Sequence, residues 1–193
     1  MTNLLIRLFV KDYQDVENHT VRERYGKFAG IVGIATNILL FCIKIFAGIV
    51  FHSVAIVADA VNNLSDSASS VVTLVGFKLS AKPADKEHPY GHARIEYISG
   101  LIVSLVILLL GFQLAQSSLG KILHPEESET SLVAVGILVV SVLIKLWQFL
   151  FYRTVGRRIS STTLEATAAD SRNDVFSTVA ILIGMGITWL TSY

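Results

Sequence analysis

The sequence predicts an all-α fold, a polytopic membrane helix bundle with five spans. Of its 193 residues, 52% are hydrophobic and only 16% are charged, and the mean hydropathy is +0.60. A soluble domain usually has about 25% charged residues, so this composition indicates a membrane protein. The net charge of +1 favours no nucleic-acid partner. The single cysteine, Cys42, excludes a disulfide framework and a thiolate metal cluster.

Five apolar segments are each long enough to cross a bilayer core, which takes about 20 helical residues. They cover approximately residues 28–51, 53–79, 95–119, 131–152 and 164–190. Turn and charge signals separate them, including two prolines between the second and third segments and Pro125 between the third and fourth. We therefore expect a transmembrane domain over residues 28–193. Residues 1–27 should form a cytoplasmic N-terminal segment, with an interfacial helix near residues 4–10.

Basic residues predict the orientation of the chain, because Lys and Arg concentrate on the cytoplasmic side of a membrane. Among the segment ends, one side has only Lys121. The other side has Arg7, Lys11, Arg22, Arg24, Lys27, Lys78, Lys82, Lys86, Arg94, Arg153, Arg157 and Arg158. We expect a cytoplasmic N-terminus and, after five spans, an external C-terminus.

Two polar pairs interrupt the second and fifth apolar segments. Asn62 precedes Asp66 by four residues, and Asp170 precedes Asp174 by four, so each pair shares one helical face. Charges at membrane depth are costly and usually functional, which favours a cation site. The two helices should be antiparallel, and one turn rises about 5.4 Å. Depth matching therefore predicts that Asn62 faces Asp174 and that Asp66 faces Asp170. The alternative is that these polar groups only join helices through hydrogen bonds.

Other charges within the spans predict two ion pairs. Lys44 and Asp59 lie at similar distances from the outer ends of the first and second spans, and Lys145 and Glu165 both lie towards the inner side. After these pairings, the three aspartates of the polar pairs have no basic partners. Metal ions or protons must then neutralise them.

Three segments together resemble the cation diffusion facilitator family of divalent-metal/proton antiporters over nearly the whole chain. They are residues 53–66 (SVAIVADAVNNLSD), residues 83–96 (PADKEHPYGHARIE) and residues 170–174 (DSRND). The resemblance implies a secondary active transporter and not an enzyme, with no cofactor beyond the transported metal. It also implies multi-pass insertion in the cell membrane and a homodimer in the full-length protein.

The same resemblance implies which residues bind the metal. The family's transport site uses two residues of the second span and two of the fifth. These positions correspond to Asn62, Asp66, Asp170 and Asp174. Zinc members have a histidine in this quartet, commonly at the position of Asp170, whereas an all-oxygen set suits harder ions such as Mn²⁺. The chain therefore resembles the manganese-exporting branch.

Several alternatives remain open from sequence. Zinc, iron, cadmium or cobalt could be the cargo, or the chain could be a non-transporting membrane scaffold that binds metal. An intramembrane metalloenzyme would also place carboxylates and a metal at depth, but the H-E-x-x-H motif is absent from the sequence.

A second metal site is predicted in the loop between the second and third spans. Asp85, His88 and His92 have spacings that could bring them together, and some family members have an auxiliary metal site in this loop. Pro89 and Gly91 argue against a regular helix there, so a structural role for these side chains is the alternative. Relatives continue into a sixth span and a cytoplasmic C-terminal domain. We expect both to be absent from this chain, which reads as a truncated product.

Overall fold

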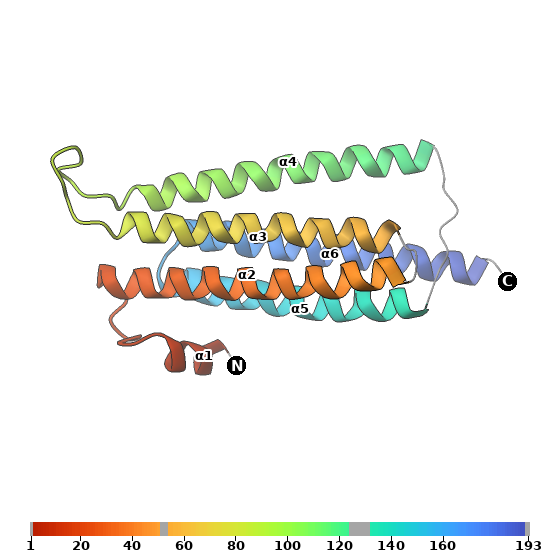
Figure 1. The fold of residues 1–193 in the computed structure, drawn as a ribbon, viewed down its shortest axis with the longest axis horizontal. Helices are drawn as coiled ribbons and strands as arrows, with labels where there is room; N and C mark the ends of the chain where they lie inside the picture. Colours follow the sequence, from red (N-terminus) through yellow and green to blue (C-terminus); the bar gives the residue numbers. More distant parts are fainter. Residues whose placement is uncertain (1, 51–53, 124–131, 192–193) are drawn as a thin grey trace.

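The computed structural model describes residues 2–50, 54–123 and 132–191, and these residues form six helices. A short helix precedes five long ones (Figure 1). The helices are α1 (Thr2–Phe9), α2 (His19–Val50), α3 (Val54–Ser80), α4 (Ile95–Leu123), α5 (Leu132–Arg158) and α6 (Thr162–Thr191). The long helices run side by side along the longest axis of the molecule. The predicted all-α membrane bundle is therefore confirmed.

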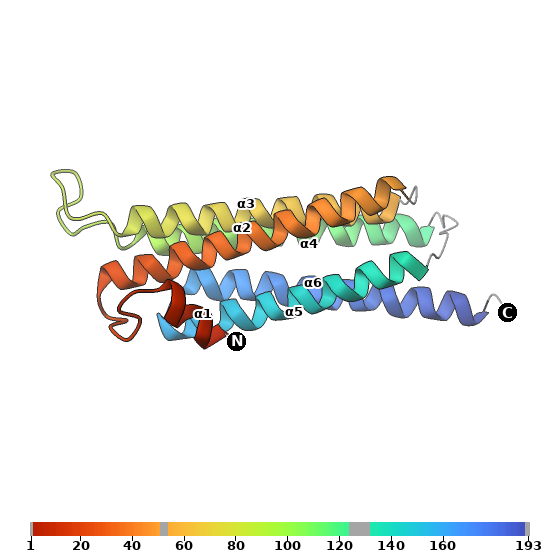
Figure 2. The ribbon, with the colours of Figure 1, turned by 60° about the horizontal axis from the view of Figure 1, so that its bottom comes forward.

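The bundle is built from two helical hairpins and one further helix. Helix α2 packs mainly against α3, α5 packs mainly against α6, and α4 contacts both α3 and α6. Figure 2 shows α2, α3 and α4 on one side and α5 and α6 on the other. This arrangement places α3 and α6, which carry the two polar pairs, in contact across the bundle.

Helices α2 and α5 extend beyond their predicted limits. Helix α2 begins at His19, nine residues before the predicted start of the first span at residue 28, and α5 continues to Arg158 instead of ending near Tyr152. The prediction excluded these ends because they are rich in Lys and Arg. Helices can continue past the hydrocarbon core into the polar region, where basic side chains are stable.

Three described helical segments are long and apolar enough to span a membrane, judged by length and composition. They are Thr20–Val50, Ile95–Gln113 and Leu132–Arg158. Helices α3 and α6 are not among them, although they have 27 and 30 residues. Both carry acidic side chains in their central turns, and their assignment as the second and fifth spans remains a prediction.

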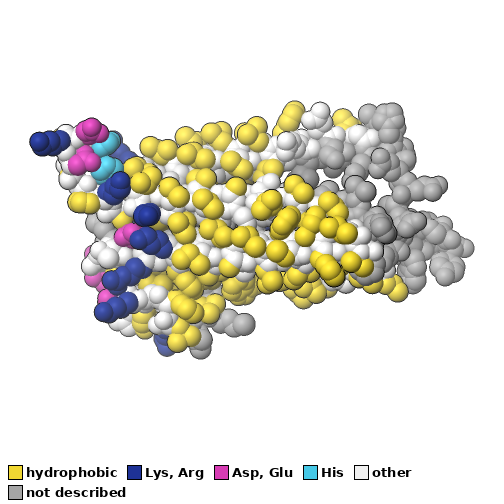
Figure 3. Space-filling model, in the orientation of Figure 1, with side chains coloured by type: hydrophobic (Ala, Val, Ile, Leu, Met, Phe, Trp, Pro, Cys, Tyr) yellow, Lys and Arg dark blue, Asp and Glu magenta, His cyan; other side chains and the backbone are white. Residues whose placement is uncertain are grey.

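Apolar and polar side chains are distributed as expected for a protein in lipid. Large hydrophobic side chains such as Phe46, Leu108 and Phe112 are at least two-thirds exposed on the outer surface. Figure 3 shows a broad hydrophobic surface along the helices, with Lys and Arg concentrated at one end. Conversely, Lys44, Asp66 and Lys145 are buried in the interior. A bilayer is the solvent that stabilises an apolar exterior of this extent.

We call the end with the Lys and Arg side chains the basic end. It contains the start of α2, the end of α3, and the turn between α5 and α6. A cluster of buried apolar residues fills the bundle there. Its large members include Tyr25, Phe77, Phe151, Tyr152, Ile159 and Leu164. Ile6 and Val10 from the α1 region also belong to this cluster, so the N-terminal segment packs against the bundle.

A polar network reinforces the basic end. The guanidinium of Arg22 lies 3.0 Å from Oε2 of Glu96 on α4 and donates a hydrogen bond to the carbonyl of Ile159. The hydroxyl of Thr163 on α6 donates to the Glu96 carbonyl at 2.7 Å. These contacts join α2, α4 and the α5–α6 turn. Together with the apolar cluster, they hold the helices together at this end.

Candidate metal site

Three carboxylates converge in the interior of the bundle. Asp66 comes from α3, and Asp170 and Asp174 come from successive turns of α6. One oxygen from each lies within 4.8 Å of the others. Asp66 and Asp170 are 3% and 7% exposed, and the Asp174 side chain is 15% exposed. We call these three residues the carboxylate cluster.

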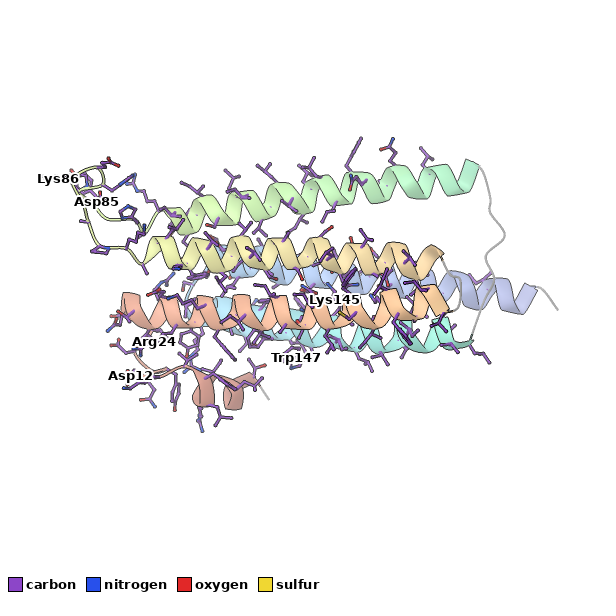
Figure 4. All side chains as sticks on the ribbon, viewed as in Figure 1. Asp12, Arg24, Asp85, Lys86, Lys145 and Trp147 are labelled. Atoms are coloured by element: carbon purple, nitrogen blue, oxygen red, sulfur yellow. The ribbon has the colours of Figure 1, made fainter. Side chains whose placement is uncertain are left out.

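Lys145 of α5 also lies in the carboxylate cluster, on the same hairpin as Asp170 and Asp174 and facing Asp66 of α3. Its ammonium donates to Asp66 Oδ2 at 2.5 Å and to Asp174 Oδ2 at 2.8 Å. The Lys145 side chain is 5% exposed, and Figure 4 shows it halfway along the bundle. Within the described residues, no ion pair within 4 Å joins Asp170 to a basic side chain.

The predicted pair of Lys145 with Glu165 is wrong. Glu165 is exposed near the start of α6, whereas Lys145 lies 13 residues after Leu132 and 13 residues before Arg158. The prediction ended this span near residue 152, which placed Lys145 too close to the inner side. Because α5 continues to Arg158, Lys145 lies at the middle of the helix, beside Asp66 and Asp174. The inference that all three aspartates lack a basic partner is therefore also wrong.

The α5 sequence contains a signal for this position that the prediction did not use. Ser141, Lys145, Gln148 and Tyr152 are all buried, and their spacings of four, three and four residues place them on one helical face. A polar stripe on an otherwise apolar helix indicates the face towards the bundle interior. Gln148 extends the stripe towards α2, since its amide donates to Thr36 Oγ1 at 2.5 Å.

Neighbouring hydroxyls leave the carboxylates available for other partners. Ser70 donates to the Asp66 main-chain carbonyl at 3.1 Å, and Thr178 donates to the Asp174 carbonyl at 2.9 Å. These hydroxyls therefore satisfy helix carbonyls and not carboxylates. Asp66 Oδ1 is buried without a hydrogen-bond partner in the described part of the chain. A buried carboxylate oxygen in this state is suited to a cation, because leaving it unsatisfied is costly.

Asn62 lies one helical turn before Asp66 on α3 and is partly buried. The geometry of the carboxylate cluster is compatible with an antiparallel approach of α3 and α6. The pairing of Asn62 with Asp174, and the role of Asn62 as a fourth ligand, remain predictions.

Lys44 and Asp59 meet nearer the opposite end of the bundle. Lys44 Nζ lies 2.8 Å from Asp59 Oδ2, and the two side chains are 3% and 23% exposed. Lys44 is on α2 and Asp59 on α3, so the pair connects the two helices of one hairpin. It gives each charge a partner and leaves the carboxylate cluster as a separate group.

The loop between α3 and α4 brings Asp85, His88 and His92 together without a helix. Their ligand atoms lie within 4.8 Å of one another. Asp85 Oδ2 is 3.4 Å from His92 Nε2, and Oδ1 is 3.3 Å from His88 Nδ1. Gly91, with φ of 79°, reverses the chain between the histidines, a conformation that glycine adopts readily. Figure 4 shows Asp85 beyond the helix ends, so the group is separate from the carboxylate cluster.

Local hydrogen bonds prepare Asp85 to act as a charged ligand. The backbone N–H of His88 donates to Asp85 Oδ1 at 2.6 Å, and that of Glu87 donates to the same oxygen at 3.0 Å. The hydrogen bond from His88 is the largest influence that lowers the pKa of Asp85 below its usual value. Asp85 therefore stays ionised to a lower pH than an ordinary aspartate does. A carboxylate and two imidazoles form a suitable ligand set for zinc and similar metals.

Comparison with known proteins identifies the family. Residues 30–193 match the family described as cation efflux transmembrane domain. The manganese efflux system protein MneS of Bacillus subtilis (strain 168) is 33% identical over 168 residues, which are 84% of this chain and 58% of MneS. The uncharacterized transporter YdbO of the same organism is 34% identical over 161 residues, 83% of this chain and 55% of YdbO.

A third relative is the cation-efflux pump FieF of Salmonella arizonae. It is 31% identical over 172 residues, 88% of this chain and 57% of FieF. The chain thus spans a little more than half the length of these relatives. The family match covers most of α2 and all of α3 to α6, and it includes every residue of the carboxylate cluster. The chain belongs to the cation efflux family, a family of transporters and not of enzymes.

Proposed function

We propose that the bundle is the transport domain of a divalent-metal efflux transporter and that the carboxylate cluster binds the cargo. The convergence of Asp66, Asp170 and Asp174 within 4.8 Å carries this proposal. Three ionised carboxylates and the Lys145 ammonium have a formal charge of −3 + 1 = −2. One divalent cation neutralises this charge, which is otherwise costly in a low-dielectric interior.

Mn²⁺ is the cargo that the ligand chemistry favours. The cluster supplies carboxylate oxygens, and Asn62 would add an amide oxygen from the adjacent turn of α3. Oxygen ligands suit Mn²⁺, whereas imidazole suits zinc. Mg²⁺ retains its waters strongly, and Ca²⁺ needs more ligands than four side chains readily supply. The similarity to a manganese efflux system protein supports the same choice.

Metal release is proposed to depend on proton exchange by alternating access. Metal and protons are competing cations for the same carboxylates, because either can neutralise a cluster that self-repulsion makes unfavourable. When the site faces outside, protons displace the metal, and the inward proton gradient drives export. The apolar cluster at the basic end would then have to rearrange when the site loads from the cytoplasm.

The loop residues Asp85, His88 and His92 are proposed to form a second, non-transport metal site. Its exposed position at the end of α3 and before α4 would place a bound ion in the cytoplasm. The distribution of Lys and Arg supports a cytoplasmic N-terminus in the cell membrane. We also propose that residues 28–193 are the transport domain and that the full-length protein forms a homodimer, as the family resemblance implies.

Transport measurements in proteoliposomes test the proposed function. The purified chain is reconstituted with a metal-sensitive dye and a pH-sensitive dye, and Mn²⁺ is added outside. We expect Mn²⁺ entry accompanied by opposite proton movement, which D66A and D174A each abolish. D15A, an exposed substitution in the N-terminal segment, is the matched control. Metal-dependent proton flux that persists in D66A and D174A would contradict the proposal.

A further inference from the structure

We propose that Lys145 is an internal competitor of the transported cation, a tethered ammonium that lowers metal affinity and so permits release. This inference rests on the proposed function of the carboxylate cluster. It assigns a role to a residue of α5, a helix that supplies none of the proposed metal ligands.

The position of Lys145 fits a role within the cluster. It lies at the midpoint of α5, and its ammonium bridges two helices by bonding Asp66 of α3 and Asp174 of α6. The side chain is 5% exposed, and a charge buried to this extent is stable only with compensating partners. The partners here are the same carboxylates that would bind the metal.

Competition follows from the oxygen atoms that Lys145 uses. Its ammonium donates to Oδ2 of Asp66 and to Oδ2 of Asp174. A metal must either take these oxygens from Lys145 or bind the remaining oxygens while sharing the carboxylates with a second cation. The first route breaks two charge-assisted hydrogen bonds. The second places like charges close together in a low-dielectric interior. Both routes weaken metal binding.

Weakened binding has a use in a transporter. A site must bind its ion well enough to load and weakly enough to unload. Three carboxylates with no internal cation would hold a divalent ion strongly. An ammonium that can return to Asp66 and Asp174 stabilises the site as the metal leaves, and it thereby lowers the barrier to release.

Lys44 provides a natural comparison. It is also a buried lysine in the bundle, 2% exposed against 4% for Lys145. However, Lys44 pairs with Asp59, which is not part of the carboxylate cluster. Loss of Lys44 therefore removes a buried charge and an ion pair without removing a competitor for metal.

The test measures Mn²⁺ affinity and release rate for wild type, K145M and K44M, each as the purified chain. We expect K145M to bind Mn²⁺ at least about tenfold more tightly than wild type, because a neighbouring positive charge is gone. Mn²⁺ should also dissociate more slowly from K145M. Any gain in affinity should be smaller in K44M than in K145M, because Lys44 pairs with Asp59 and bonds none of the cluster carboxylates. If Lys145 only stabilised the fold, K145M would be less stable than wild type and would show no gain in Mn²⁺ affinity.

The outcomes separate this inference from the proposed function. If wild type binds Mn²⁺ and K145M binds equally or more weakly, the role assigned to Lys145 is overturned and the proposed function stands. If wild type binds no divalent metal, both fail. Should K145M not fold, K145Q replaces it, since the glutamine amide retains an N–H donor for Asp66 but has no charge. K145Q must then show the same gain in affinity, and unchanged affinity would overturn the inference.

Discussion

Lys44 on α2 and Asp59 on α3 form an ion pair, with 2.8 Å between Nζ and Oδ2. Lys44 is almost fully buried, and Asp59 retains some exposure. We expect K44M to lower the free energy of unfolding by about 3 kcal/mol or less, because it leaves Asp59 without its partner. The double variant K44M/D59L should recover most of this loss. Unfolding titrations in detergent measure both, and additive losses in the double variant would contradict a coupled pair.

Asp170 is predicted to control metal preference. Substitution D170H introduces an imidazole into a carboxylate cluster, and imidazole favours zinc relative to manganese. We expect the ratio of Zn²⁺ to Mn²⁺ transport rates in proteoliposomes to rise about tenfold. D12H, which changes an exposed aspartate of the N-terminal segment, controls for the added histidine. An unchanged ratio in D170H would count against selection by ligand hardness.

The loop group predicts a second bound ion. H92A removes a proposed ligand whose side chain is 9% exposed and lies 3.4 Å from Asp85. We expect Zn²⁺ stoichiometry by titration calorimetry to fall from about two ions per chain to about one. E87A changes an exposed residue of the same loop and should leave the stoichiometry unaltered. Two ions in both variants would show that the loop histidines do not bind metal.

Gly100 and Gly111 on α4 provide a matched test of helix packing. A Cβ at Gly100 would lie 3.3 Å from the backbone N of Thr163 on α6, whereas a Cβ at Gly111 would meet nothing within 4 Å. G100L should therefore destabilise the protein by about 1–3 kcal/mol. G111L should change stability by about 0.5 kcal/mol or less. Thermal unfolding in detergent compares them, and equal effects would contradict close packing of α4 against α6.

Much of the fold is predictable from the sequence because lipid imposes simple rules on helix length and composition. The predicted limits of the second span, 53–79, nearly coincide with Val54–Ser80. Helices α2 and α5 continue beyond the predicted first and fourth spans at their basic ends. Hydropathy locates the hydrocarbon core, but it does not show how far a helix continues into the polar region, as α2 does to His19 and α5 does to Arg158.

The acidic residues of the site were predictable from their spacing, whereas Lys145 was not. Asp66, Asp170 and Asp174 occur in pairs at helical spacing, which identifies one face of each helix. Lys145 is a single charge, and its depth depended on where α5 ends. The predicted end of this span lies six residues before the end of α5, about 9 Å along a helix. This difference was enough to predict an ion pair of Lys145 with Glu165. The stripe of Ser141, Lys145 and Gln148 indicates that Lys145 faces the bundle interior, but it does not indicate how far along the bundle Lys145 lies.

We propose that Asp66, Asp170 and Asp174 together bind a divalent cation inside the bundle. Anomalous diffraction from crystals of the chain grown with Mn²⁺, recorded near the manganese absorption edge, tests it most directly. We expect an anomalous peak among the three carboxylates in wild type and its loss in D66A. A wild-type structure that shows Mn²⁺ at the loop residues but none among these carboxylates would contradict the claim.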